Sequence, residues 1–500
     1  MNVDRIARNV SASLAEKEVE RLLRVILKGT PFAGKTHAVG GYVRDEYMGL
    51  EAKDLDVVVE MDGGSNKLTN IIHQMYPKAT STPRQMGASY PIWQITFKDD
   101  VEVSDDTFQT KGAVIEFADT MKEGFPDENS RQRTTMSGTL KDDIERRDFT
   151  ANMLLKDLST GEIVDMTGTS KSDIEKGILR GHPGVSLDKI FSDDPLRMIR
   201  LIRFQAKYGW KIPLSVLKTV KRNAQRIKIV SSERIMGELE KVMKMGKLGQ
   251  AIRIMKATGL LQHIFPEIEA MRGVKQSPVH HAEGDVFTHT VKVLKNAKPG
   301  VESQLAALMH DVGKPATQKF VDDKIKFLGH EQISGEIARA MMKRLKFDNK
   351  TTDKVVRVVE NHMRPHALVR GGGPKAIRKF IREVGEELVD AVVDLAEADD
   401  LGRIPHNLDK VPEFRRIVEE VRNAPIQVSK NPVLNGKEIM SILGIEKGDR
   451  SRLPEIGEAG KFLLELADDY AADGKELTKR DAEKALNSRR GVIRRSKETL

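Results

Sequence analysis

Gly40-Gly41-Tyr42-Val43-Arg44-Asp45 is followed shortly downstream by Asp54-Leu55-Asp56-Val57-Val58-Val59, and these two stretches decide how the chain is interpreted. The second stretch alternates polar and apolar residues, which predicts a β-strand with Asp54 and Asp56 on one face. Neighbouring carboxylates repel each other unless a cation lies between them, and hard oxygen ligands suit Mg²⁺. The diglycine lets the backbone approach a bulky triphosphate. Together the two stretches predict a metal site beside a phosphate-binding turn.

The composition indicates a folded, basic protein of several domains. Its 500 residues, 39% hydrophobic and 31% charged, exceed one hydrophobic core, so three or four domains are expected. No apolar run is long enough to span a bilayer, and the absence of cysteine excludes disulfides and thiolate metal sites, which is consistent with a cytoplasmic protein. The net charge of +9 indicates a polyanionic partner, whereas 5% aromatic residues argues against recognition mainly by base stacking.

Residue patterning predicts an N-terminal mixture of helices and strands, followed by mostly helical sequence from Ile144 onward. A helix is predicted over about 13–28, strands over 37–39, 54–59, 90–97 and 113–117, a mobile loop over 119–141, a connector over 183–192, and helices over 193–210 and 231–244. The predicted domains are an N-terminal helical extension (1–35), a head (36–160), a helical neck and body (161–275), a metal-type domain (276–415) and a basic helical tail (416–500).

Gly29-Thr30-Pro31-Phe32-Ala33-Gly34-Lys35-Thr36 matches the P-loop pattern. A P-loop leaves a strand and opens a helix, whereas here a helix is predicted before the motif and a strand after it. Pro31 and Gly34 are also accounted for by a helix-to-strand turn. We therefore interpret this segment as a turn.

Two arginine-rich segments follow. In Arg146-Arg147-Asp148-Phe149-Thr150-Ala151-Asn152, arginines beside a carboxylate are suited to a triphosphate and ribose hydroxyls, although a solvated helix start is the alternative. In the segment from Asp193 to Phe204, Arg197, Arg200 and Arg203 recur every three residues and form a basic stripe on a predicted helix. Asp194 and Arg197 would place an acceptor beside a planar donor, a pair able to read one base edge; a solvated face is the alternative.

Histidines are concentrated in the second half, where seven of the twelve lie between His280 and His366. Imidazole and carboxylate groups on converging helices hold divalent metals and lower the pKa of a bound water. In order and spacing, six residues resemble the HD metal-phosphohydrolase domain: His289, His310, Asp311, His330, His362 and Asp399. The resemblance implies that these six bind the metal, whereas His280, His281 and His366 fall outside the pattern and are interpreted as structural.

The N-terminal motifs, in their order along the chain, resemble the class II CCA-adding tRNA nucleotidyltransferase and bacterial poly(A) polymerase family. The HD domain favours the HD-bearing CCA-adding type. The resemblance implies an α+β fold, in which a nucleotidyltransferase head with a small mixed sheet precedes a helical neck and body, an all-α HD domain and a helical tail. It implies that Asp54 and Asp56 bind catalytic Mg²⁺. Glu116, on a neighbouring strand, is interpreted either as an accessory carboxylate or as a solvated residue at a strand end. The resemblance further implies nucleotide binding by Gly40, Gly41, Arg44, Arg147, Asp148, Asn152, Asp194, Arg197, Arg200 and Arg203.

The implied reaction is template-independent addition or repair of the tRNA 3′-terminal CCA from CTP and ATP. The HD domain implies phosphatase or 2′,3′-cyclic phosphodiesterase activity on RNA 3′ ends, with Ni²⁺, Mn²⁺ or Mg²⁺. The partners expected are tRNA, CTP and ATP, without a membrane; the oligomeric state stays open. A poly(A) polymerase is the first alternative, and an HD phosphohydrolase with an inactive RNA-binding head is the second.

Overall fold

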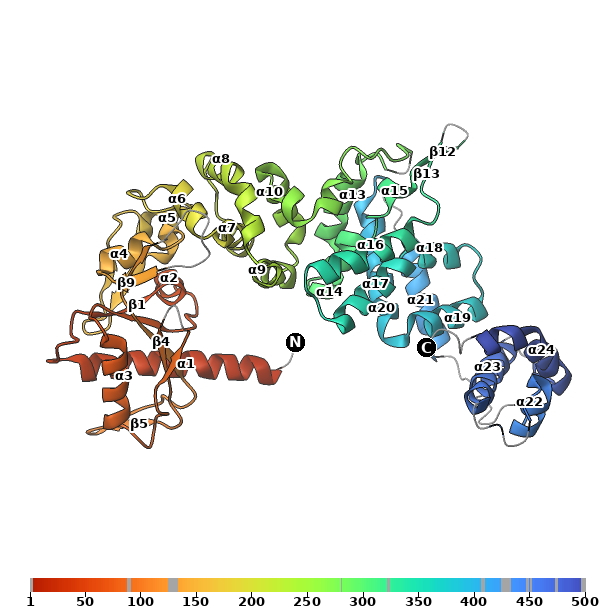
Figure 1. Cartoon of the computed structure of the whole chain (residues 1–500), viewed down its shortest axis with the longest axis horizontal. Helices are drawn as coiled ribbons and strands as arrows, with labels where there is room; N and C mark the ends of the chain where they lie inside the picture. The colour runs from red at the N-terminus through yellow and green to blue at the C-terminus, as the bar shows by residue number, and fades with distance from the viewer. Residues whose placement is uncertain are drawn as a thin grey trace. The chain divides into compact units, whose positions relative to one another are not determined.

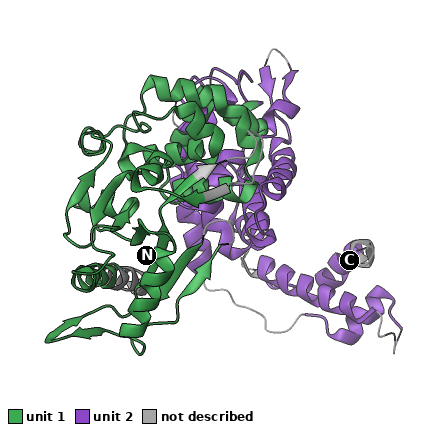
Figure 2. Ribbon diagram, turned by 60° about the vertical axis from the view of Figure 1, so that its left-hand side comes forward, with its two compact units in different colours: residues 1–269 green, residues 270–500 purple. Residues whose placement is uncertain are grey.

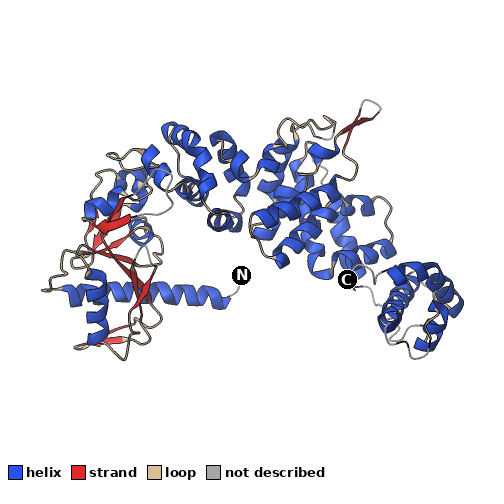
Figure 3. Cartoon of the chain, in the orientation of Figure 1, coloured by secondary structure: helices blue, strands red, loops and turns tan. Residues whose placement is uncertain are grey.

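The computed structural model describes residues 3–87, 91–124, 134–279, 281–321, 324–405, 410–423, 433–446, 449, 452–472 and 475–495. The chain forms two compact units, residues 1–269 and 270–500 (Figure 2). The fold is α+β: a mixed sheet with helices in the first unit is followed by mostly helical sequence (Figure 3). Among the described residues, no helix combines the length and the apolar character needed to cross a bilayer. The limits of the five predicted domains and the cytoplasmic location stay predictions.

A seven-stranded sheet organises the first unit, in the order β11-β10-β1-β2-β7-β4-β3. Its neighbouring strands pair antiparallel except β2 and β7, which are parallel. The strands are β1 (Thr36–Val39), β2 (Asp56–Val59), β3 (Arg84–Met86), β4 (Ile92–Thr96), β7 (Val114–Asp119), β10 (Leu154–Asp157) and β11 (Ile163–Asp165). Two hairpins accompany the sheet: β5 (Val101–Val103) with β6 (Asp106–Phe108), and β8 (Met121–Gly124) with β9 (Thr134–Ser137).

The helices of the first unit surround this sheet and then continue as a helical segment (Figure 1). They are α1 (Val3–Leu27), α2 (Gly41–Tyr47), α3 (Gly64–Met75), α4 (Leu140–Glu145), α5 (Ser170–Lys176), α6 (Leu187–Asp193), α7 (Leu196–Tyr208), α8 (Leu214–Asn223), α9 (Ser232–Lys244), α10 (Leu248–Thr258), α11 (Leu261–Ile264) and α12 (Pro266–Glu269), with short 3₁₀ turns at Thr150–Asn152 and Ala224–Ile229.

Helix α1 belongs to the core of the sheet unit. Val19, Leu22, Leu23 and Leu27 recur on one helix face, are fully buried and share a hydrophobic cluster with sheet residues such as Val57. Burial of each such side chain contributes about 1.5–3 kcal/mol, so the helix is held firmly. The segment after α1 is a turn that leads directly into β1. This confirms that the P-loop-like sequence is a turn between a helix and a strand.

Several predictions about local structure were wrong. The sequence after Ile144 is mostly helical, as predicted, but it also contains β10 and β11, which were not predicted; β10 pairs with the distant strand β1, and β11 pairs with β10. The 183–192 connector contains most of α6, and the following helix begins at Leu196, after Pro195. The 119–141 loop contains the β8–β9 hairpin; residues 125–133 lie outside the described residues. Asp54 precedes β2 in a left-handed conformation with φ 61° and is not a strand residue.

The second unit is built from helices and one short hairpin that the sequence did not predict. Its elements are α13 (Val286–Asn296), α14 (Val301–Met309), α15 (Lys314–Thr317), β12 (Lys319–Val321), β13 (Lys324–Lys326), α16 (His330–Arg344), α17 (Asn349–Asn361), α18 (Arg364–Val369), α19 (Pro374–Val384), α20 (Glu386–Gly402), α21 (Lys410–Asn423), α22 (Gly436–Leu443), α23 (Leu453–Ala472) and α24 (Lys479–Arg495). The last three helices share a small core of their own that includes Leu443, Leu463 and Leu486.

Candidate functional sites

All twelve residues that the sequence predicted for the first unit line one cavity of about 890 Å³. They are Gly40, Gly41, Arg44, Asp54, Asp56, Arg147, Asp148, Asn152, Asp194, Arg197, Arg200 and Arg203. The set comes from α2, β2, the 3₁₀ turn and α7 with their flanking loops, so the fold collects side chains from distant parts of the sequence. Arg146, Lys207 and Arg234 also line the cavity and add further positive charge.

A third carboxylate lies beside the two aspartates, on a neighbouring strand of the sheet. Asp56 begins β2 and lies opposite Glu116 of the parallel strand β7, which confirms the predicted neighbouring position of Glu116. Burial, helped by the charges of Glu116 and Asp54 and opposed by Arg147, raises the pKa of Asp56 to about 6. A carboxylate whose charge is disfavoured in this way gains from a bound cation, and oxygen donors suit Mg²⁺. The donor set therefore fits the implied metal.

Glu16, which the sequence did not single out, supports the loop that carries these aspartates. It lies on α1, is 8% exposed, and accepts hydrogen bonds from the backbone N–H groups of Asp54 and Leu55. Three residues earlier, the Ser13 hydroxyl donates to the Ala52 carbonyl at 2.7 Å. Burial and the nearby Asp54 charge raise the pKa of Glu16 to about 7. Helix α1 thus holds the aspartate loop from the side opposite the strand.

A network of ion pairs connects the predicted nucleotide-binding residues. Arg44 Nη1 donates to Asn152 Oδ1 at 2.5 Å, and Asn152 Nδ2 donates to Asp148 Oδ1 at 2.8 Å. The other oxygen of Asp148 accepts from Arg200 Nε at 2.8 Å. Burial opposes ionisation, but Arg200 and Asn152 hold the pKa of Asp148 below its ordinary value. Arg44 also lies over the ring of Tyr208 at 5.0 Å. The cations are therefore preorganised along one wall.

Asp143 is a second group that the sequence missed. It is fully buried, and its two oxygens accept from Arg146 Nη2 at 2.5 Å and Arg147 Nη2 at 2.8 Å. Burial alone would raise the pKa of Asp143, but the two guanidinium groups outweigh it and lower the pKa. Gly40 has φ 72°, and a Cβ there would lie 3.6 Å from Arg147 Nη1. Asp143 therefore orients Arg147 against the diglycine turn.

We expect Asp143→Asn to lower the free energy of unfolding by about 2 kcal/mol at pH 7, because two guanidinium groups lose their ionic partner. The folded pKa of Asp143 is lowered, so its contribution is fully present above the unfolded value near 3.9 and is lost as the pH falls through the folded pKa. Urea unfolding at several pH values measures this difference. Asp105→Asn, at an exposed hairpin carboxylate, is the matched control. A difference that persists unchanged well below pH 3 contradicts the assignment.

Asp194 and Arg197 are close together, but they do not lie on one helix as predicted. Asp194 caps the end of α6 in an extended conformation, and its carboxylate accepts from the Leu196 N–H at 3.2 Å. Arg197 is 7% exposed and donates to the carbonyls of Ile190 at 3.2 Å and Arg146 at 2.6 Å. A solvated face is therefore excluded for Arg197. Backbone carbonyls hold its guanidinium in one orientation within the cavity.

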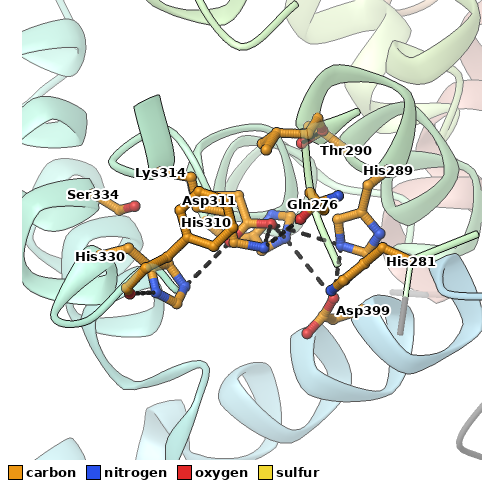
Figure 4. Close-up of polar contacts among 12 residues, drawn as sticks. Gln276, His281, His289, Thr290, His310, Asp311, Lys314, His330, Ser334 and Asp399 are labelled. Carbon is orange, nitrogen blue, oxygen red and sulfur yellow. Dashed lines mark hydrogen bonds and ion pairs between the residues drawn. The ribbon is translucent and has the colours of Figure 1, made fainter. Parts of the chain in front are cut away.

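The six histidine-cluster residues predicted for the second unit come together at one point (Figure 4). They fall into two groups, one with His289, His310 and Asp399 and the other with Asp311, His330 and His362. Asp311 faces both, since its Oδ2 lies 3.1 Å from His310 Nε2 and its Oδ1 lies 3.3 Å from His330 Nε2. His289 Nε2 lies 2.8 Å from Asp399 Oδ1. A Cβ at Gly313 would lie 2.6 Å from the His330 carbonyl, so this close packing requires glycine.

The ring orientations fit a metal. His310, His330 and His362 each bond through Nδ1 to the carbonyl three residues earlier, at 2.9, 2.8 and 2.6 Å. Their Nε2 atoms and Asp311 Oδ2 are buried without a hydrogen-bond partner. Burial lowers the pKa of His362 to about 3, which keeps that ring neutral. Buried, converging and unsatisfied donor atoms fit divalent cations, and second bonds through Nδ1 are typical of metal-binding histidines.

Several neighbours of this cluster were missed or interpreted as structural. Glu283 Oε1 lies 2.9 Å from His289 Nδ1 and 2.7 Å from His281 Nδ1, so His281 belongs to the surroundings of the site. Arg403 pairs with Asp399 and Lys314 with Asp311. His366 Nε2 lies 3.7 Å from Asp399 Oδ2. His280 lies outside the described residues. The sequence shows the helical spacings of Asp311 with Lys314 and of Asp399 with Arg403, but not the contacts of Glu283.

Three known protein families match successive parts of this chain. Residues 36–180 match the poly A polymerase head domain, residues 209–272 match the probable RNA and SrmB-binding site of polymerase A, and residues 286–404 match the HD domain. The CC-adding tRNA nucleotidyltransferase of Thermus thermophilus is 30% identical over 370 residues, covering 72% of this chain and 79% of the relative. A multifunctional CCA protein of Haemophilus influenzae is 31% identical over 333 residues, covering 62% of this chain and 71% of the relative.

Solved structures show the same fold. The Bacillus stearothermophilus CCA-adding enzyme in complex with CTP has a TM-score of 0.56 at 19% identity and covers 92% of this chain and 94% of its own. The Thermotoga maritima CCA-adding enzyme complexed with tRNA has a TM-score of 0.56 at 18% identity, covering 94% of each chain. At these identities the similarity supports the architecture alone.

Proposed function

Because this chain belongs to the class II CCA-adding tRNA nucleotidyltransferase family, we propose that it adds or repairs the 3′-terminal CCA of tRNA from CTP and ATP. The observation that carries the proposal is the convergence in one cavity of the aspartate pair, the arginine wall and Asp194 with Arg197. The net charge of +9 suits an RNA partner. The name of the Thermus relative says that it acts on tRNA. Solved structures of similar fold include one complex with CTP and one with tRNA.

The aspartates and arginines of the cavity have separate roles in this proposal. Asp54 and Asp56 would hold divalent ions, which when bound supply charge neutralisation at the reacting phosphate. Arg44 and Arg147 would bind the triphosphate, with Asn152 and Asp143 fixing their directions. The left-handed backbone at Gly40 leaves space for phosphate oxygens beside Arg147. The chain thus contributes orientation and electrostatic stabilisation, which dominate phosphoryl transfer.

Asp194 and Arg197 would select the base. A carboxylate accepts from the exocyclic amine that cytosine and adenine share, and a guanidinium donates to a ring acceptor. Guanine and uracil present a carbonyl in place of the amine, and an unmet buried hydrogen bond costs about 1–3 kcal/mol. Arg197 retains further N–H donors beyond the two that bind the Ile190 and Arg146 carbonyls.

A tRNA transcript without its last three nucleotides, supplied with single nucleoside triphosphates, tests this function. We expect CTP alone to add two nucleotides and ATP to add one to the product, with GTP and UTP inactive. Long tails from ATP without use of CTP contradict the proposal and support a poly(A) polymerase. The Thermus relative is named CC-adding, so addition of CC without A is the second candidate, and the ATP step decides between them.

For the second site we propose hydrolysis of phosphate or 2′,3′-cyclic phosphate at RNA 3′ ends. His289, His310 and Asp399, together with Asp311, His330 and His362, would hold divalent ions, and Asp311 faces both groups. Bound ions supply an activated water near neutral pH. Glu283 keeps Nε2 of His289 directed inward, and Lys314 and Arg403 add positive charge for a phosphate. A free hydroxyl would then be available to the first site.

A further inference from the structure

A second cavity, of about 600 Å³, opens on the histidine cluster. Besides Asp311, His330 and Asp399, its lining includes five cationic residues, namely Lys314, Lys326, Arg370, Arg403 and Lys410. Lys314 and Arg403 pair with the metal-cluster aspartates. Lys326 and Arg370 have no carboxylate partner within the part of the chain that the structure describes. The positive charge therefore extends beyond what the cluster itself uses.

The β12–β13 hairpin projects from the helices of the second unit (Figure 1), and Ile325 and Lys326 of β13 line the cavity. Its register places Lys319 opposite Lys326 and Val321 opposite Lys324, so the lysines share one face. On the other face Phe320 lies opposite Ile325, which lines the cavity. Phe320 is 73% exposed. The hairpin thus presents a lysine face and an uncovered aromatic ring.

The hairpin is coupled to the metal cluster through the chain. His330 follows β13 after Phe327, Leu328 and Gly329. The Phe327 carbonyl accepts from His330 Nδ1 at 2.8 Å, and Lys314 Nζ lies 5.3 Å from the centre of the Phe327 ring. Leu328 lines the cavity and is 76% exposed. A ligand on the hairpin is therefore adjacent to the cluster.

We propose that the β12–β13 hairpin, with Arg370 and Lys410, binds the single-stranded 3′ end of an RNA whose terminal phosphate lies at the histidine cluster. This inference rests on the hydrolytic function proposed for that cluster. Cations spread outward from the cluster match a chain of phosphates better than one small phosphate ester. An exposed aromatic ring beside such a groove stacks on a base of any sequence. The surface therefore selects an RNA strand over a mononucleotide.

The test compares an RNA oligonucleotide ending in a 2′,3′-cyclic phosphate with bis(p-nitrophenyl) phosphate, using the full chain and Mn²⁺ or Ni²⁺. We expect the triple variant Lys326→Gln/Arg370→Gln/Lys410→Gln to raise KM for the RNA about 10-fold or more and to leave KM for the small ester within about 2-fold. The slope of the logarithm of the RNA binding constant against the logarithm of the salt concentration should become shallower by about 2. Each phosphate contact with a single strand contributes about 0.7 to that slope. The matched control carries Lys295→Gln, Lys343→Gln and Lys350→Gln, at exposed lysines outside the cavity. Equal effects on both substrates, or none on the RNA, overturn the inference.

A second readout separates this inference from the hydrolytic function. An RNA with 4-thiouridine near its 3′ end should cross-link to the 319–330 segment, and Phe320→Leu should reduce the yield while Phe320→Trp retains it. If the small ester is not hydrolysed but the cross-link forms, the hydrolytic proposal fails and the binding surface stands. If the ester is hydrolysed and no cross-link to this segment forms, the binding surface is wrong and the hydrolytic proposal stands.

Discussion

Asp56→Asn abolishes nucleotide addition, with an expected loss of about 1,000-fold or more in single-turnover rate. The change removes one oxygen ligand of the predicted ions and leaves the side-chain shape intact. Burial and the charges of Glu116 and Asp54 raise the pKa of Asp56, so its ionised form is disfavoured in the folded protein. At pH 8 without metal, the variant should therefore unfold at the same temperature as the wild type or higher. Gel assays with CTP and thermal unfolding measure the two effects.

Asp105→Asn is the control for this variant, because it removes an exposed carboxylate of the same unit without reaching the cavity. Hydrolysis of bis(p-nitrophenyl) phosphate by Asp56→Asn should stay at the wild-type level. Undiminished nucleotide addition by Asp56→Asn would remove the aspartate pair from the proposed chemistry. Wild-type protein that hydrolyses the ester but adds no nucleotide would support an HD phosphohydrolase with an inactive head.

Asp311→Asn should have the reverse pattern, with hydrolysis at the histidine cluster reduced about 1,000-fold or more and nucleotide addition retained. Asp311 is the only cluster residue, among those described, whose two oxygens face the two histidine groups. Its replacement removes a ligand from the predicted ions. Calorimetric titration with Mn²⁺ should show a large loss of affinity. Retained CTP addition in the same preparation shows that the chain is folded.

Asp353→Asn serves as the control, since this exposed carboxylate on α17 makes only a surface ion pair with Arg339. Because Asp311 is buried and pairs with Lys314, the variant is also expected to lose stability, so metal affinity is compared below its unfolding temperature. Equal metal affinity of the wild type and Asp311→Asn would refute the role of Asp311 as a metal ligand that serves both histidine groups.

The sequence alone predicted the site residues that lie close together within one short motif. Asp54 and Asp56, Arg147 and Asp148, and His310 and Asp311 stand within two residues of each other in the sequence, so chemistry and spacing were sufficient to select them. The strand positions at β1, β2, β4 and β7 were also confirmed, because short runs rich in apolar and β-branched residues mark strands in a sequence. The same signals missed β10 and β11, which are short strands: β10 pairs with β1, far away in the sequence, and β11 pairs with β10 at the edge of the sheet.

The groups that the sequence missed act through partners far away or through burial. Glu16 contacts the Asp54 loop from a separate helix, and Glu283 contacts Ile404 and His289 across the second unit. Asp143 stands close to Arg147 in sequence, but only its complete burial reveals that it is a required ionic partner. Each of these carboxylates acquires its role from a packed environment that local spacing does not encode.

The amino-acid order alone determined which side chains carry the chemistry, because paired aspartates, spaced arginines and histidines have ligand properties in any context. Tertiary structure alone decided that the twelve residues predicted for the first unit share one cavity, that Asp311 faces two histidine groups, and that Arg197 is held by carbonyls. The physical reason is that ligand type is a property of a residue, whereas orientation, burial and pKa depend on neighbours brought together by non-local packing.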